Sequence, residues 1–290
     1  MRKILLSIYE KIVKALSGYG IGRFYLVRVV HNFIISHLKP NFVEVQGHKM
    51  FLDSKDSLGL SITGIHEPFE TELVKKEIRK RDVVLDIGAN IGYYTLIFAK
   101  LVGEEGKVFA FEPDPDNFAL LKKNVQINGY QNVILVQKAV SNKTAKIRLY
   151  LSEENKGDHR IYDSHEHRKS IEIEAIRLDD YFKNYNGRVN FIKMDIQGAE
   201  GGAIEGMTNL LKKNKSVKIM TEFWPIGLKR FGIDPEEFLK LLMQYGFKLY
   251  HIIEQEKKIE PVNISSSYSK LLDRYYPDGD FTYLLCVKER

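Results

Sequence analysis

Cysteine is nearly absent from this chain of 290 residues, since Cys286 is the only one. The chain therefore forms no internal disulfide and no cysteine-based metal cluster, which is typical of a reducing, cytoplasmic compartment. Long apolar runs are lacking as well, because none reaches the roughly 18 residues that a membrane-spanning helix needs. The apolar stretch at residues 4–9 is short and is followed by Glu10 and Lys11, so we expect no signal peptide.

An excess of charge of one sign is confined to the first 40 residues. Residues 1–40 hold seven Lys and Arg against Glu10 alone, whereas the other 250 residues hold 37 basic and 37 acidic side chains. A nucleic-acid-binding domain usually carries a basic stripe across its fold, so we expect no nucleic-acid partner. The segment 1–40 is predicted to form a helix that packs on the rest of the protein or on a partner. The alternatives are a basic amphipathic helix on an anionic membrane surface and a disordered or cloning-derived segment.

Apolar runs alternate with helical patterns along the rest of the chain, which predicts an α/β fold with a mostly parallel sheet covered on both faces. Residues 41–80 are expected to form a cap, with two short strands in 42–52 and an entry helix in 66–80. Residues 81–290 are expected to form the main domain. Its strands are predicted at Val83–Ile87, Lys107–Phe111, Val133–Gln137, Val189–Met194, Val217–Thr221, Phe247–Ile253 and Phe281–Val287. Its helices are predicted at Gly92–Val102, Pro115–Asn128, Ala203–Lys212 and Pro235–Tyr245.

Two further predicted strands, Ala145–Leu151 and Ser170–Ile176, interrupt this alternation. The stretch between them is polar, and its histidines are His159, His165 and His167. Their spacing matches no common zinc pattern, and no cysteine supports one. We expect a hairpin-like insertion with a mobile, solvated loop. In the alternative, His159 or Arg160 reaches the substrate when the loop closes.

An acidic residue and a glycine-rich turn follow the first strand of the main domain. The spacing is Asp86-x-Gly88-x-Asn90-x-Gly92, and a helical pattern begins after it. A dinucleotide fold has Gly-x-Gly-x-x-Gly with a small third residue, which lets the helix pack closely on the strand. Here Asn90 takes the second glycine position and Tyr93 the third. The turn therefore indicates a nucleoside cofactor with a short zwitterionic tail, and a nicotinamide-dependent dehydrogenase is the weaker alternative.

The same motif resembles motif I of the class I S-adenosylmethionine-dependent methyltransferases. Further segments narrow the resemblance to the FkbM-like methyltransferases, over roughly residues 42–223. These segments are Gly64–Pro68, Phe111–Asp114, Ala139–Ser141, Leu178–Tyr181 and Phe191–Glu200. The chain departs from the family pattern at Gln197, where glutamate is usual, and at Gly201 and Gly202, where helix formers are usual.

This resemblance implies a Rossmann-like class I methyltransferase fold with seven strands, the last one antiparallel, and S-adenosylmethionine as the cofactor. Ligands of such sheets bind outside the carboxyl ends of the strands. Asp86 would contact the aminoacyl end of the cofactor or merely cap the turn, and Glu112 would accept hydrogen bonds from the ribose hydroxyls. The backbone at Ala139 would lie against the adenine. The full set of expected cofactor-binding residues is Asp86, Gly88, Asn90, Gly92, Glu112 and Ala139.

Asp195 and Glu222 end the fourth and fifth predicted strands of the parallel sheet, which places both carboxylates on one rim. Two chemistries fit this pair. One carboxylate can remove a proton from a hydroxyl, or both can hold a magnesium ion that lowers the pKa of the hydroxyl. In a third alternative the two side chains only cap loops. Glu200 is expected either to stabilise the start of the next helix or to belong to the site.

The resemblance implies an O-methyltransferase that acts on a hydroxyl, foremost that of a sugar or glycan. The alternatives are a methyltransferase with another small-molecule acceptor and a non-catalytic scaffold that binds the cofactor. Gln197, Gly201 and Gly202 keep the scaffold alternative open. The expected location is the cytoplasm, with peripheral membrane contact through residues 1–40 as a further alternative.

Overall fold

The computed structural model describes residues 42–262 and 280–288, together with residues 9, 11–13, 15, 24, 26, 27, 30, 33, 34, 271, 274 and 275. Most of the predicted segment 1–40 lies outside the described residues, so its helix and its membrane contact stay predictions. Of its described part, Tyr9 and Val13 pack against Ile62. No helix among the residues described is long and apolar enough to cross a membrane.

The segment before the main sheet contains the two short strands and the entry helix that the sequence predicts. Its elements are β1 (Phe42–Val45), β2 (His48–Phe51), α3 (Leu60–Thr63) and α4 (Pro68–Glu77). β1 and β2 form an antiparallel hairpin of their own. The short helix α3 was not predicted, and it ends at Gly64, which adopts a left-handed backbone conformation.

The main sheet has eight strands in the order β12–β11–β13–β10–β9–β3–β4–β5. Their bounds are β3 (Val83–Ile87), β4 (Lys107–Phe111), β5 (Val133–Val136), β9 (Phe191–Met194), β10 (Val217–Phe223), β11 (Lys248–Ile253), β12 (Lys258–Pro261) and β13 (Thr282–Lys288). Strands β5, β4, β3, β9 and β10 are parallel neighbours, and β13 runs antiparallel between β10 and β11. All seven predicted strands are present. The eighth, β12, was not predicted and adds an antiparallel edge beyond β11.

The order of the strands reverses between β3 and β9. From β3 the chain moves outward through β4 to β5, and it then returns to the other side of β3 as β9. A crevice opens outside the carboxyl ends of the strands at such a point. Gly88 allows the close approach of the two strand ends there, because a Cβ atom on it would lie 2.0 Å from the carbonyl oxygen of Asp195.

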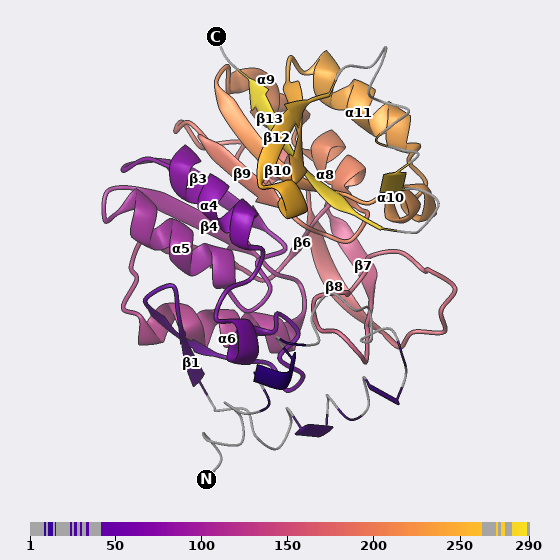
Figure 1. Ribbon diagram of the computed structural model, residues 1–290. Coiled ribbons are helices and arrows are strands. Elements are labelled where there is room, and N and C mark those ends of the chain that lie inside the picture. The colour runs from indigo at the N-terminus through magenta and orange to yellow at the C-terminus, as the bar shows by residue number, and fades with distance from the viewer. Residues whose placement is uncertain are drawn as a thin grey trace.

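A second, three-stranded sheet carries the predicted insertion. It consists of β6 (Ala139–Val140), β7 (Ala145–Tyr150) and β8 (Ser170–Ile176) in the order β6–β8–β7. β7 and β8 pair antiparallel, as the sequence predicts. Figure 1 shows this sheet beside the main sheet. The loop between β7 and β8 contacts α6 (Pro115–Ile127) through Lys156 and α10 (Pro225–Phe231) through Glu166.

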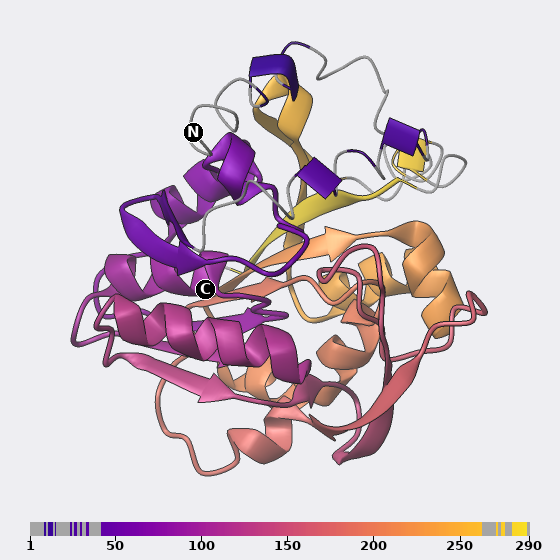
Figure 2. The same ribbon diagram turned by 90° about the horizontal axis from the view of Figure 1, so that it is seen from below.

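Helices cover both faces of the main sheet (Figures 1 and 2). Apolar side chains of α4, α5 and α6 pack on one face, and those of α8–α11 pack on the other. The bounds are α5 (Tyr93–Val102), α6 (Pro115–Ile127), α7 (Leu178–Tyr181), α8 (Glu200–Gly206), α9 (Thr208–Lys213), α10 (Pro225–Phe231) and α11 (Pro235–Gln244). The prediction of a single helix at Ala203–Lys212 is wrong, because Met207 interrupts the helix and separates α8 from α9. α7 and α10 were not predicted as helices.

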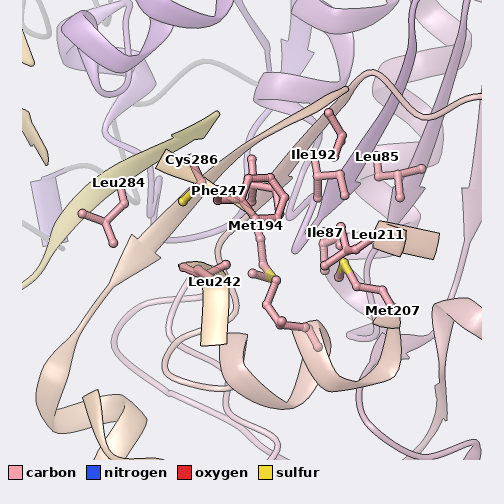
Figure 3. Packing of buried hydrophobic residues seen from close by; sticks show 14 of the residues in the cluster. Leu85, Ile87, Ile192, Met194, Met207, Leu211, Leu242, Phe247, Leu284 and Cys286 are labelled. Atoms are coloured by element: carbon pink, nitrogen blue, oxygen red, sulfur yellow. The ribbon is translucent and has the colours of Figure 1, made fainter. Parts of the chain in front are cut away.

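Successive residues of the central strand supply the two halves of the core. Leu85 and Ile87 of β3 belong to the cluster under α8–α11, whereas Val84 belongs to the cluster under α4–α6. This alternation follows from the two-residue repeat of a strand. Figure 3 shows the first cluster, in which Cys286 lies beside Phe247 and Leu284. Burial raises the pKa of the Cys286 thiol, so the single cysteine acts as a small apolar core residue.

Substitution of Gly88 by alanine should destabilise the protein more than the same change at Gly129. Both glycines have positive φ angles, of +81° and +74°, so each alanine would incur a left-handed backbone penalty of about 1–2 kcal/mol. Only at Gly88 does the new Cβ also collide with backbone, whereas nothing lies within 4 Å at Gly129. We expect Gly88→Ala to lower the free energy of unfolding in urea by at least about 2 kcal/mol more than Gly129→Ala. Equal losses would show that β3 and β9 do not need this close approach.

Candidate active site

Strand register brings charged side chains together at the switch point. Asp86 of β3 lies opposite Lys193 of β9, and Glu222 of β10 lies opposite Tyr283 of β13. Asp195 follows Lys193 by two residues and therefore returns to the same face of the sheet. Asp86, Lys193, Glu222 and Tyr283 are each at most 3% exposed. The expectation that Asp195 and Glu222 share one rim is met, and Asp86, Lys193 and Tyr283 lie there with them.

Lys193 provides the positive charge of this group. Its Nζ lies 3.1 Å from Oδ2 of Asp195 and 4.6 Å from the centre of the Tyr94 ring. Burial alone would lower the pKa of the Lys193 ammonium. The carboxylates of Asp195, Glu67 and Asp86 outweigh burial and raise this pKa above its ordinary value, so the ammonium stays charged.

Asp195 accepts hydrogen bonds at both carboxylate oxygens. Lys193 Nζ and Tyr283 Oη bind Oδ2, the latter at 2.8 Å, and Gln197 Nε2 donates to Oδ1 at 2.9 Å. The Asp195 side chain remains 19% exposed, which makes it accessible from the pocket in front of the sheet. These contacts orient the Asp195 carboxyl group toward that pocket.

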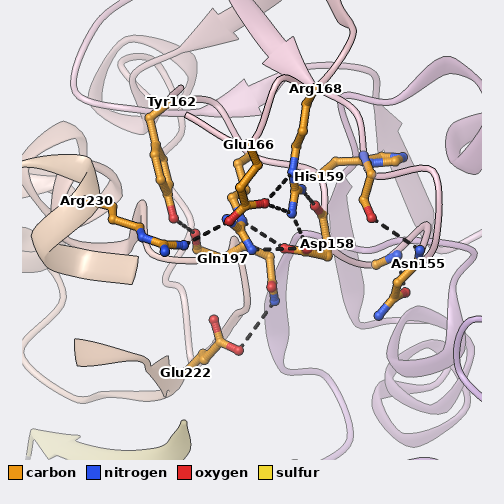
Figure 4. Close-up of polar contacts among 12 residues, drawn as sticks. Asn155, Asp158, His159, Tyr162, Glu166, Arg168, Gln197, Glu222 and Arg230 are labelled. Atoms are coloured by element: carbon orange, nitrogen blue, oxygen red, sulfur yellow. Dashed lines mark hydrogen bonds and ion pairs between the residues drawn. The ribbon is translucent and has the colours of Figure 1, made fainter. Parts of the chain in front are cut away.

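Glu222 differs from Asp195 in its environment. Its Oε1 accepts a 3.3 Å hydrogen bond from Gln197, whereas its buried Oε2 has no partner among the described residues. Burial, followed by the charges of Asp195 and Glu200, raises the pKa of Glu222 well above its ordinary value. Figure 4 shows Gln197 reaching toward Glu222 from the loop after β9. The amide at position 197 thus bridges the two carboxyl groups, where the usual glutamate would add a third carboxyl group.

This geometry does not favour the magnesium alternative. Among the described residues, no group of three or more His, Cys, Asp and Glu side chains is arranged to hold a metal ion. The ammonium of Lys193 already supplies a cation next to Asp195. The described residues therefore give no support to a magnesium ion held by Asp195 and Glu222.

Glu67 is a site residue that the sequence did not single out, although it lies in the matched segment Gly64–Pro68. It is the N-cap of α4 and adopts a left-handed conformation with φ of 45°. Its Oε2 accepts a 2.8 Å hydrogen bond from Tyr94, and its Oε1 lies 2.6 Å from Tyr283 Oη and 3.2 Å from His66 Nε2. Burial would raise the pKa of Glu67, but His66 and Lys193 hold it at about 2. Tyr283 had no signal in the sequence, because only sheet pairing brings it to this rim.

Asp86 faces the same pocket and has one carboxylate oxygen available for a ligand. Its Oδ2 accepts a hydrogen bond from Thr95, while the buried Oδ1 has no partner among the described residues. Burial raises the pKa of Asp86 to about 6. We call this space the carboxylate pocket. It has a volume of about 180 Å³, and its charged lining residues include Glu67, Asp86, Lys193, Asp195 and Glu222.

The glycine-rich turn is closed by Glu112. The backbone N–H of Asn90 donates to Oε2 of Glu112 at 2.8 Å, and that of Asp114 donates to Oε1 at 2.9 Å. Gly88, Asn90 and Gly92 all have positive φ angles, which gives the turn its tight curve. Burial raises the pKa of Glu112 to about 8, and the two backbone donors act in the opposite direction.

A second pocket adjoins the first and is walled mainly by apolar side chains. We call it the apolar pocket. Its apolar walls include Phe111, Ala139, Val140, Leu149 and Ile161. Glu112 lies at its edge, and Gly88, Asn90 and Asp195 line both pockets. An apolar slot next to a carboxylate suits a flat base attached to a ribose. Ala139 lines this pocket, and its contact with an adenine stays a prediction.

The insertion loop covers the apolar pocket and is anchored by ion pairs (Figure 4). His159 lines the pocket with a side chain only 6% exposed, and its Nδ1 accepts a 3.0 Å hydrogen bond from the backbone of Ser152. The fully solvated loop that we expected is thus correct for His165, whose side chain is 91% exposed, and wrong for His159. The ion pairs join Asp158, Arg160, Glu166, Arg168 and Arg230.

Glu200, which matches the family pattern, and the two glycines after it, which depart from it, all have structural roles at the start of α8. Glu200 is buried at the start of α8, and its Oε1 accepts a 2.9 Å hydrogen bond from the backbone N–H of Ile196. It therefore fixes the loop after β9. A Cβ atom on Gly201 would lie 2.3 Å from Ile233, and one on Gly202 would lie 2.8 Å from Phe231. Glycine at both positions lets α8 pack closely against its neighbours.

Comparison with known proteins places this site in a family. Residues 86–249 match the family model described as the Methyltransferase FkbM domain. The hexuronic acid methyltransferase AglP of Haloferax volcanii is 29% identical over 59% of this chain and 66% of its own length. The 2-O-methyltransferase NoeI of Sinorhizobium fredii is 29% identical over 53% of this chain and 71% of its own length. The solved methyltransferase FkbM of Methylobacillus flagellatus is 14% identical, with a TM-score of 0.43, over 90% of this chain and 59% of that chain.

Substitution of Glu222 by glutamine should stabilise the protein increasingly as the pH rises. The pKa of this acid is raised in the folded state, so folding favours its protonated form and stability is lost as the pH rises above the unfolded-state value. The advantage of Glu222→Gln in free energy of unfolding should grow between about pH 5 and pH 8, by at most about 1.4 kcal/mol per pH unit. Glu104→Gln, at an exposed position, is the control and should show no such growth. A pH-independent difference would contradict the buried, protonated state of Glu222.

Proposed function

The chain belongs to the FkbM methyltransferase family, and we propose that it transfers the methyl group of S-adenosylmethionine to the hydroxyl oxygen of a sugar. The observation that carries this proposal is the placement of three acids, Asp86, Glu112 and Asp195, at the carboxyl ends of β3, β4 and β9. They surround one crevice that has an apolar slot on one side and a charged pocket on the other.

The two pockets match the two ends of this cofactor. The unpartnered Oδ1 of Asp86 would accept a hydrogen bond from the ammonium of the aminoacyl tail. Glu112 would accept hydrogen bonds from the ribose hydroxyls, and the apolar pocket beside Ala139 would hold the adenine. A sulfonium carries a positive charge, and the carboxylates around the pocket stabilise it. Gly88, which lines both pockets, has no side chain that would obstruct this path.

The chemistry is an in-line displacement at the methyl carbon. An oxygen lone pair of the acceptor forms the new O–C bond, the C–S bond breaks, and its electron pair stays on sulfur. The acceptor hydroxyl loses its proton to a base. We assign this base to Asp195, because Lys193 and Gln197 hold it as a carboxylate toward the pocket. Glu222 is kept neutral by burial and would donate a hydrogen bond to the acceptor.

The charge of the carboxylate pocket supports an uncharged acceptor. The carboxylates of Glu67, Asp86 and Asp195 face it, and Lys193 is the main opposing cation. A carboxylate on the acceptor would be repelled at this short range. We therefore propose a neutral sugar hydroxyl rather than the acidic sugar that the name of AglP specifies.

Replacing Glu112 with alanine should weaken the binding of S-adenosylmethionine. The loss of a charge-assisted hydrogen bond to the ribose should cost about 1.5–3 kcal/mol, or roughly ten- to 150-fold in affinity. Isothermal titration calorimetry measures this directly. Asp116→Ala, a change in the first turn of the α6 helix that follows Glu112, is the control and should leave affinity unchanged. Unaltered binding by the Glu112 variant would remove Glu112 from the cofactor site.

Replacing Asp195 with asparagine should separate cofactor binding from turnover. The variant should bind S-adenosylmethionine near wild-type affinity but transfer label from the methyl group at least about 100-fold more slowly, because the base is lost. The assay uses neutral methyl glycosides as acceptors, with a hexuronic acid as the charged comparison. Turnover within twofold of wild type would exclude Asp195 as the base. Faster transfer to the hexuronic acid would contradict the neutral acceptor.

A further inference from the structure

A continuous row of polar atoms leads from Asp195 to the outside of the protein. Oδ2 of Asp195 lies 2.8 Å from Tyr283 Oη, which lies 2.6 Å from Oε1 of Glu67. The same Oε1 lies 3.2 Å from Nε2 of His66, whose side chain is 27% exposed. Three different elements supply these atoms, namely the loop after β9, strand β13 and the N-terminus of α4.

The number of protons in this row is informative. A tyrosine hydroxyl has one proton, so Tyr283 donates to only one of the two carboxylates it touches. The other contact is favourable when that carboxyl group carries a proton of its own and donates it to the Tyr283 oxygen. The geometry therefore allows a proton to pass between Asp195 and Glu67 through the Tyr283 oxygen.

From this geometry we propose that Tyr283, Glu67 and His66 form a proton relay, an inference that rests on the proposed function. The relay carries the proton away from the Asp195 carboxyl group after each methyl transfer. When the acceptor oxygen bonds to the methyl carbon, its proton passes to the Asp195 carboxylate. Tyr283 then gives its hydroxyl proton to Glu67 and takes the proton held by Asp195. Glu67 passes its proton to Nε2 of His66, and the imidazole releases one to water from its other nitrogen. The Asp195, Tyr283 and Glu67 side chains regain their starting protonation states, and one proton leaves per methyl group transferred. The His66 imidazole is left with its proton on Nε2 and regains its starting tautomer by exchanging protons with water.

The surroundings keep the relay directional. Lys193 lies beside Asp195 and stabilises its carboxylate, which favours loss of the proton from Asp195. Tyr94 also bonds to Glu67, but at Oε2, on the side away from Tyr283. Tyr94 therefore supports Glu67 without lying between it and Asp195. Tyr283, Glu67 and His66 act through Asp195 and are positioning residues in this scheme.

The test compares Tyr283→Phe with Tyr94→Phe, since each variant loses one hydroxyl that contacts Glu67. Tyr283→Phe should reduce methyl transfer at least about tenfold, within the range of proton-transfer contributions. Tyr94→Phe should stay within about threefold of wild type, and both should bind S-adenosylmethionine normally by calorimetry. A merely structural role would not distinguish the two variants in turnover while sparing cofactor affinity in both.

His66→Ala provides a second measurement. It should slow transfer, and imidazole added to the buffer should restore part of the rate by replacing the missing proton acceptor. The same imidazole should not restore Tyr283→Phe, because the break there is buried. If wild type transfers methyl groups and the two tyrosine variants behave alike, or if imidazole leaves His66→Ala unchanged, the relay is overturned while the proposed function stands. If wild type transfers no methyl group to any hydroxyl, the proposed function fails and the relay fails with it.

Discussion

The rest of the site depends on the attraction between the buried ammonium of Lys193 and the carboxyl groups around it. Four carboxyl groups, those of Glu67, Asp86, Asp195 and Glu222, are directed to the carboxyl end of one sheet. Without an internal cation their mutual repulsion and loss of hydration would oppose folding. Lys193 lies directly opposite Asp86 in the sheet register and bonds to Asp195. The aromatic faces of Tyr94 and Tyr283 add to the stabilisation of its charge.

The same arrangement leaves polar atoms unsatisfied in the core of the crevice. Oδ1 of Asp86 and Oε2 of Glu222 are buried and have no hydrogen-bond partner among the described residues. A protein selected for stability alone would replace them, because an unpaired buried acceptor usually costs about 1–3 kcal/mol. Functional sites commonly carry such a loss of folding stability, because a bound ligand supplies the missing hydrogen-bond partner.

The sequence predicted the parts of this protein that depend on local patterns. The apolar run at Val83–Ile87 and the motif after it were placed correctly, because a buried strand and a glycine-rich turn have strong local signals. The break at Met207 and the edge strand β12 were missed, since close packing around α8 and pairing with β11 decide them. The most important omission was the contact between Glu67 and Tyr283, which are 216 residues apart. No spacing along the chain indicates a contact that exists only once β13 has paired with β10.

The position of β13 in the sheet affects the order in which parts of this protein fold during synthesis. The strand pairs with β10 on one side and β11 on the other, yet it is synthesised after both. While the chain emerges from the ribosome, β11 therefore lacks its neighbour toward the centre of the sheet, and Glu67 lacks Tyr283. Pairings between distant segments form late and slowly. A nascent chain can thus fold the glycine-rich turn and its parallel strands first, and the contacts of Tyr283 with Glu67 and Asp195 form last.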